Sequence, residues 1–131
     1  MPLDQITANR SNLERILDNL KEGIIAHDMQ RRIFFFNTEA ERITGFSRQD
    51  VLGKDCHEAF GAPFCGEKCS FCEPHPALPD HCEYPITIYR RNGEARRVEM
   101  SVTGMSGDDG APIGVVACFR DVTDMLSLQI Q

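Results

Sequence analysis

The sequence lacks the features of membrane proteins, of secreted proteins and of nucleic-acid-binding proteins. No segment approaches the roughly 18 consecutive apolar residues that span a bilayer, and the N-terminus MPLDQITANR has no apolar signal-peptide core. Basic residues are outnumbered, with 14 lysines and arginines against 20 aspartates and glutamates and a net charge of -6. We therefore expect a cytoplasmic protein with no membrane span and no nucleic-acid surface, because phosphate binding needs basic side chains.

The sequence also lacks a recognisable catalytic arrangement. No Ser-His-Asp set, phosphate-binding glycine loop or pair of catalytic carboxylates can be identified in it. We therefore do not expect an enzyme. The chain has 131 residues, of which 41% are hydrophobic and 26% charged, and this composition predicts one globular domain.

Cysteine, by contrast, is concentrated in one segment. Residues 56–85 read CHEAFGAPFCGEKCSFCEPHPALPDHCEYP and hold five of the six cysteines, three of the four histidines and five of the seven prolines. Because so many prolines prevent a long helix, we expect order in this segment to come from packing or from a bound ion. In a reducing compartment, thiols at this spacing are typical of metal-binding or redox-active sites.

Four of these cysteines form the predicted metal site. Thiolates in a C-x-x-x-C-x-x-C pattern converge when a short turn carries them, and a fourth soft ligand lies upstream. The predicted ligands are Cys56, Cys65, Cys69 and Cys72, with Cys82, His57, His75 and His81 as substitutes. Such a set suits zinc or an iron–sulfur cluster, and spacing does not choose between them. A disulfide, a reversible dithiol switch and inert cysteines are the alternatives.

The first 20 residues have the pattern of an amphipathic helix. Residues 3–20 place apolar side chains at helical spacing, and Gly23 is expected to close the helix. One row of side chains has the spacing of a helix that pairs with the same helix of a second chain, which predicts a homodimer. The alternative is that the helix covers the sheet of its own domain. This row consists of Ile6, Asn9, Leu13, Ile16 and Leu20.

The remaining pattern predicts five strands and two short helices. The helices are expected to begin at Thr38 and Ser47, after capping residues. The last strand is apolar at nearly every position, so we expect it to be covered on both faces. Asn92-Gly93 predicts a hairpin with a solvated tip that carries four arginines. The strands are expected at residues 24–27, 33–36, 84–90, 98–103 and 113–119.

Four stretches of the chain carry a resemblance to a known family. They read LDNLKEGIIAHD, FFFNTEAERITGFSRQDVLGK, YRRNGEARRVEMSV and GAPIGVVACFRDVTD. Together they resemble a PAS domain, the sensory box of bacterial sensor kinases and sigma-54-type transcriptional regulators. The resemblance implies an α+β fold with a five-stranded antiparallel sheet, short helices on one face that enclose a sensing cavity, and the N-terminal amphipathic helix.

The resemblance also implies how the chain is organised for signalling. We expect a capping or dimerising helix at residues 1–22, a PAS domain at 23–124 with a cysteine-rich insert at 56–85, and the start of a signalling helix at 125–131. In this family such a helix leads to an output domain, such as a kinase, a cyclase or a transcriptional activator. Asp121 and Thr123 match the junction between the last strand and that helix, so we expect them to orient it.

Two hypotheses for function follow. The first is a sensor of redox state, oxygen or metal that acts through the cysteine cluster. The alternative is a ligand-binding or dimerisation module with a small-molecule cavity, in which the cysteine-rich loop is only structural. Flavin is disfavoured because Asp55, His57 and Phe60 replace the polar residues that surround flavin in light-sensing relatives. Heme is disfavoured because histidines beside prolines and cysteines are more typical of surface loops or zinc sites.

The remaining histidine and cysteine have simpler interpretations. His27, in the first expected strand, is interpreted as a sheet histidine whose hydrogen bonds are satisfied. Cys118, in the last expected strand, is remote in sequence from the other cysteines and is interpreted as a small buried thiol.

Overall fold

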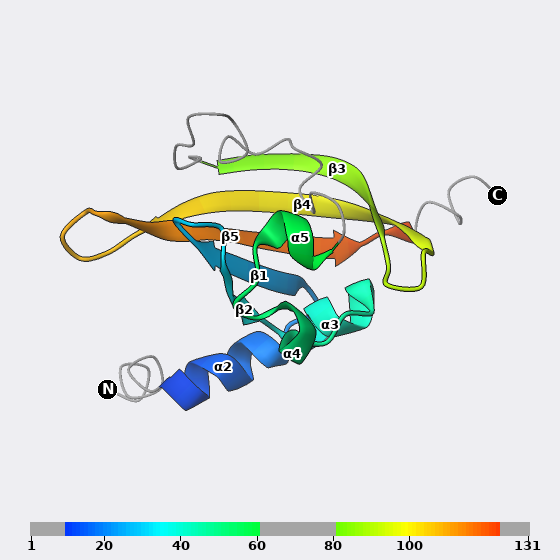
Figure 1. The fold of residues 1–131 in the computed structure, drawn as a ribbon, viewed down its shortest axis with the longest axis horizontal. Helices are drawn as coiled ribbons and strands as arrows, with labels where there is room; N and C mark the ends of the chain where they lie inside the picture. Colours follow the sequence, from blue (N-terminus) through cyan, green and yellow to red (C-terminus); the bar gives the residue numbers. More distant parts are fainter. Residues whose placement is uncertain (1–9, 61–80, 124–131) are drawn as a thin grey trace.

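A computed structural model describes residues 10–60 and 81–123 of the chain (Figure 1). These residues form a five-stranded antiparallel sheet with short helices, as expected. The strands are β1 (Gly23–Asp28), β2 (Ile33–Phe36), β3 (His81–Tyr89), β4 (Ala95–Ser106) and β5 (Pro112–Asp121), in the spatial order β2-β1-β5-β4-β3. The helices are α2 (Arg10–Asp18), α3 (Thr38–Thr44), α4 (Arg48–Val51) and α5 (Cys56–Ala59).

Helices α3, α4 and α5 lie together on one face of the sheet, which we call the inner face (Figure 1). Alternate residues of each strand point toward these helices and form the core, because strand side chains alternate between faces. The largest fully buried side chains include Phe36, Phe119, Ile33, Met100 and Val98. None of the helices in the described ranges is long and apolar enough to cross a membrane.

Helix α2 ends earlier than the sequence predicted. Its last residue is Asp18, and Gly23 begins β1 instead of closing the helix. The glycine is needed for packing, because a Cβ atom at this position would lie 2.4 Å from the ring of Phe119. The N-terminal part of the predicted helix and the predicted signalling helix at residues 125–131 lie outside the described residues.

Strand β5 is covered less completely than its apolar sequence predicted. Val115 and Phe119 point into the core and are buried. On the opposite, outer face, Val116 and Cys118 are only half-buried. Ile113, at the register shift near the start of the strand, is 48% exposed. The outer face of the sheet therefore retains apolar surface.

The hairpin between β3 and β4 forms at Asn92-Gly93 as predicted, and its tip also contacts two helices. Gly93 has a φ angle of 89°, which only glycine adopts without strain. The backbone N–H of Arg91 donates to the carbonyl of Thr44 at 2.9 Å, at the end of α3. The Arg91 guanidinium also pairs with Asp50 at 2.5 Å. Residues 91–95 are exposed, so the tip is solvated as predicted, and Arg91 in addition docks it on α3 and α4.

Strand β3 begins at His81, three residues earlier than expected, and contains Pro85. A proline is tolerated within a strand at the edge of a sheet, where its nitrogen can point away from the hydrogen-bonded neighbour. Strand β3 is the last strand of the sheet in the described part of the chain, and it pairs with β4 alone. Pro85 therefore does not end the strand.

One buried amide, that of Asn37, holds the N-terminal half of the domain together. Its Oδ1 accepts hydrogen bonds from the backbone N–H groups of Ile24 and Ala40, each at 2.9 Å. Its Nδ2 donates to the carbonyls of Leu17 at 2.9 Å and Glu22 at 3.0 Å. The side chain is fully buried. Asn37 thus joins the end of α2, the start of β1 and the first turn of α3.

We expect Asn37→Ala to lower the free energy of unfolding by about 3 kcal/mol, because each buried polar group left without a partner costs roughly 1–3 kcal/mol. Asn19→Ala is the matched control. Asn19 is exposed, and its side chain donates one hydrogen bond to the carbonyl of Arg15, so we expect a change below about 1 kcal/mol. Urea unfolding followed by circular dichroism measures both. Similar losses in the two variants would contradict the central role of Asn37.

Candidate functional site

Cys56 and Cys82 lie on the two sides of the segment that the structure does not describe, and both belong to the core side of the sheet. Cys56 is the first residue of α5 and is 8% exposed. Cys82 lies on β3, is half-buried and packs against the same hydrophobic core. The residues on either side of positions 61–80 therefore lie beside one core, with one inward-facing cysteine on each side.

Aromatic packing fixes the chain just before this segment. The ring of Phe60 lies 5.1 Å from that of Phe46, edge to face, and 6.0 Å from that of Phe36. Offset and edge-to-face contacts at these distances are favourable beyond the apolar area that they bury. Helix α5, which the sequence analysis did not predict, is thereby held against β2 and the connection between α3 and α4, together with Cys56.

Most of the predicted metal ligands lie outside the described residues. This holds for Cys65, Cys69, Cys72 and His75, and for the side chain of His57. Within residues 10–60 and 81–123, no group of three or more His, Cys, Asp or Glu side chains is placed to hold a metal ion. The predicted site thus remains a prediction, to which the structure adds the inward positions of Cys56 and Cys82.

His81 and Cys82 are neighbours that face opposite sides of the sheet. The Nδ1 of His81 lies 2.8 Å from the hydroxyl of Thr103, and its Nε2 lies 3.4 Å from a carboxylate oxygen of Glu83. All three residues belong to the outer face, whereas the Cys82 thiol packs against the core. Of these two substitute ligands, Cys82 is the one on the side of Cys56.

The remaining histidine and cysteine take no part in the cysteine-rich segment. His27 is buried in β1, and its Nδ1 lies 2.8 Å from the carbonyl of Asp28, so it is the sheet histidine that the sequence predicted. Cys118 is half-buried on the outer face of β5 rather than in the core. Burial raises the pKa of the Cys118 thiol, and the negative charge of Glu22 raises it further. A thiol with a raised pKa is a poor nucleophile near neutral pH.

The end of β5 is tied to the start of β4 by Asp121 and Thr123. The backbone N–H of Arg97 donates to the Thr123 hydroxyl at 2.8 Å, and the N–H of Thr123 donates to Oδ1 of Asp121 at 3.0 Å. Between them, the N–H of Val122 donates to the carbonyl of Arg97 at 2.8 Å. The other carboxylate oxygen of Asp121 lies 3.6 Å from the Arg96 guanidinium. These bonds set the direction in which the chain leaves the sheet.

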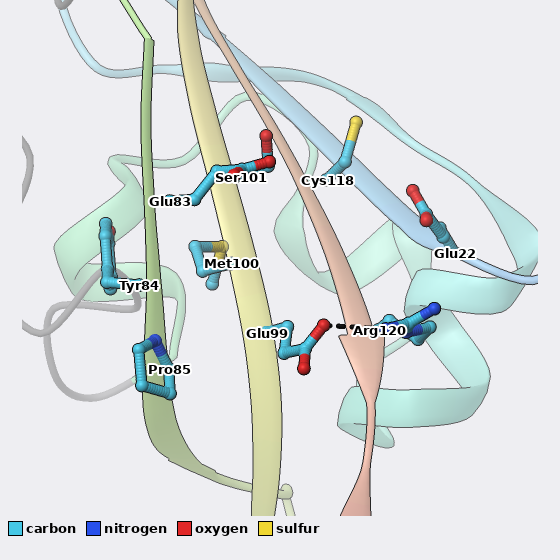
Figure 2. Close-up of a pocket in the computed structure, with 9 residues that line it drawn as sticks. All are labelled: Glu22, Glu83, Tyr84, Pro85, Glu99, Met100, Ser101, Cys118 and Arg120. Carbon is cyan, nitrogen blue, oxygen red and sulfur yellow. Dashed lines mark hydrogen bonds and ion pairs between the residues drawn. The ribbon is translucent and has the colours of Figure 1, made fainter.

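A cleft of about 450 Å³ lies on the outer face of β3, β4 and β5. Most of the residues that line it are polar (Figure 2). Glu83, Ser101 and Cys118 form one cross-strand row in this cleft. In the next row, Arg120 donates to Glu99 at 2.7 Å, the bond drawn as a dashed line. Glu22, from the connection between α2 and β1, adds a third carboxylate to the rim.

A second cleft of about 570 Å³ lies between α2 and the outer face of β1, β2 and β5. Cys118 borders both clefts, so the two are neighbours. Most of the residues that line the second cleft are apolar. They include Leu13, Leu17, Ile24, Ala26, Phe34 and Val116.

Comparison with known proteins agrees with this architecture. The family model of the PAS domain matches residues 21–124. The chain is 29% identical over 121 residues to the probable diguanylate cyclase DgcE of Escherichia coli strain K12, covering 88% of this chain and 11% of that protein. It is also 29% identical over 111 residues to the signal transduction histidine-protein kinase AtoS of the same strain, covering 82% and 17%. The chain thus spans less than a fifth of either relative.

A solved structure shares the fold. The PAS domain of BvgS from Bordetella pertussis aligns with a TM-score of 0.68 and 19% identity, over 96% of this chain and 92% of that one. The five-stranded antiparallel sheet and its short helices are therefore those of a PAS fold, as the resemblance implied. With a family match that covers most of its length, the chain belongs to the PAS domain family, the sensory modules of signal-transduction proteins.

Proposed function

We propose that this PAS domain senses redox state, oxygen or metal through its cysteine-rich segment, and that it passes the signal to an output domain of a larger bacterial protein in the cytoplasm. The observation that carries the proposal is the inward, buried position of Cys56 in α5. A thiolate that gains or loses a metal ion changes charge and geometry, and close-packed cores tolerate such changes poorly. A change at Cys56 therefore acts directly on the packing of α5 against the sheet.

The donor chemistry fits zinc or an iron–sulfur cluster. Cys65, Cys69 and Cys72 are spaced as thiolate ligands are in such sites, and Cys56 supplies a fourth sulfur. Cys82 faces the same side of the sheet as Cys56, so it is the best-placed substitute among the described residues. Either kind of site responds to oxidants, because metal-bound thiolates must stay reduced and deprotonated.

Metal analysis of anaerobically purified protein, combined with its absorption spectrum, tests this proposal. Zinc without iron would indicate a zinc–thiolate site, which can brace the loop or sense oxidants through its thiolates. Iron together with sulfide would indicate an iron–sulfur cluster. We expect Cys69→Ser to lose the metal, because a hydroxyl is a poor substitute for a thiolate ligand. Cys118→Ser is the control and should keep full metal content, since Cys118 lies on the outer face. A wild-type protein without metal, or full metal content in Cys69→Ser, would refute the metal site.

For the output, we propose a histidine kinase, a cyclase or a transcriptional activator. AtoS is named as a histidine-protein kinase and DgcE as a probable diguanylate cyclase, and this chain matches only a small part of each. Asp121 and Thr123 support a relay at the end of β5, because they hold the strand end by side-chain hydrogen bonds. In this proposal they orient the helix that leads to the output domain.

We also propose a homodimer formed through α2, a role that does not depend on the cysteines. Leu13 and Ile16 lie three residues apart on α2, Leu20 follows just after its end, and each is more than a third exposed. This spacing places Leu13 and Ile16 on one side of α2, and such a row is buried when two helices pair. The apolar cleft beside α2 extends this surface onto the sheet.

Substitution on α2 tests the dimer. Ile16 is 46% exposed, so Ile16→Asp should leave the folded domain intact while placing a charge in the interface. We expect the dimer to dissociate at least tenfold more readily, measured by light scattering after gel filtration over a range of concentrations. Ser11→Asp adds the same charge at another exposed position of α2 and should not change the mass. An unchanged mass in both variants would remove α2 from the interface.

A further inference from the structure

The hairpin between β3 and β4 contacts two distant parts of the domain at once. Its tip docks on α3 and α4, and its base is bonded to the end of β5. A line of alternating charges connects the two. It consists of Arg90, Glu94, Arg96 and Asp121.

Three ion pairs make up this line. Asp121 lies 3.6 Å from Arg96, Arg96 lies 2.6 Å from Glu94, and Glu94 lies 3.9 Å from Arg90. The side chains of Arg90 and Arg96 are each 26% exposed and that of Asp121 is 17% exposed, whereas that of Glu94, at the turn, is 48% exposed. An isolated surface pair contributes little, but charges that are partly buried and share partners act together.

Arg90 connects this line of charges to α3. Its Nη2 donates to the carbonyl of Arg42 at 3.3 Å, in the last turn of the helix, where a positive charge is favourable. The Nε of Arg90 is buried and has no hydrogen-bond partner among the residues that the structure describes. Burying such a group has a cost, so the position of this guanidinium is maintained by its contacts and by packing.

The charge of Asp121, at the end of β5, also interacts electrostatically with α3. The pKa of Arg42 is raised by its hydrogen bond with Glu39, an effect that outweighs burial, and more weakly by the charges of Glu39 and Asp121. Asp121 and the last turn of α3 therefore lie within electrostatic reach of each other, although 79 positions separate Asp121 from Arg42 in the sequence.

We infer that Arg90, Glu94 and Arg96 are positioning residues that couple α3 and α4 to the strand end from which the chain leaves the domain. A shift of α3 moves Arg90 and then the hairpin, and the hairpin moves Asp121 through Arg96. The coupling would serve the proposed sensory function, and the inference rests on that function only to this extent. The contacts that make up the coupling do not depend on which signal the domain senses.

Amide hydrogen exchange of the whole chain, followed by NMR, tests the coupling. Two amides report on the two ends: that of Arg91, bonded to Thr44, and that of Val122, bonded to Arg97. We expect Asp121→Asn to speed exchange of the Arg91 amide about fivefold, and Asp50→Asn, which removes the partner of Arg91, to speed exchange of the Val122 amide by a similar factor.

The same experiment tests the route. In a Glu94→Ala background the line is broken, so Asp121→Asn should no longer affect the Arg91 amide. Glu99→Ala is the matched control, because it breaks the exposed Arg120–Glu99 ion pair, which joins β4 and β5 as the Arg96–Asp121 pair does. We expect no change in the exchange rates of the Arg91 and Val122 amides. If Asp121→Asn leaves the exchange rate of the Arg91 amide unchanged, the coupling is overturned. If Asp121→Asn still speeds this exchange in the Glu94→Ala background, the route through Glu94 is overturned. Metal content is a separate measurement, so either failure is distinguishable from failure of the proposed metal sensor.

Discussion

The domain depends above all on the buried side-chain amide of Asn37. Both hydrogen-bonding groups of this amide are fully used, by backbone groups of four different residues. These partners come from the helix before the sheet, the first strand and the helix after the second strand. Because a buried amide is stable only when its partners are in place, these elements form as a unit. The position of α2 relative to the sheet is therefore set from inside the domain.

In the same half of the molecule, α3 is bonded to neighbouring elements at both of its ends. Asp18, at the end of α2, accepts from the backbone N–H of Thr38 at 3.0 Å and from Arg48 at 3.2 Å. The far end of α3 receives the β3–β4 hairpin through Thr44 and Arg91. Helix α3 is thus fastened at both ends, to the N-terminal helix on one side and to the hairpin on the other. This arrangement suits a module that reports a change in its interior to both of its ends.

Local patterns predicted the fold well because its elements are determined by neighbours in the sequence. Asn37 caps the start of α3, Gly45 ends it with a φ angle of 77°, and the hairpin turns at Asn92-Gly93, each at a residue that favours that local structure. The docking of the hairpin tip and the coverage of β5 were not predictable, since they depend on how distant elements pack. For the site, cysteine spacing indicates ligand type, but the direction of the Cys56 thiol depends on α5, a four-residue helix with little periodicity to detect.

Pro85 has a consequence for how the domain meets other chains. It lies in the middle of β3, the outermost strand of the described sheet on that side, and it has no N–H group. A row of unpaired amides on an outer strand is a template for adding a foreign strand, and a proline interrupts such a row. Lateral growth of the sheet into filaments is therefore opposed at this margin. The proposed dimer, by contrast, would use side chains of α2 and not the backbone of a strand.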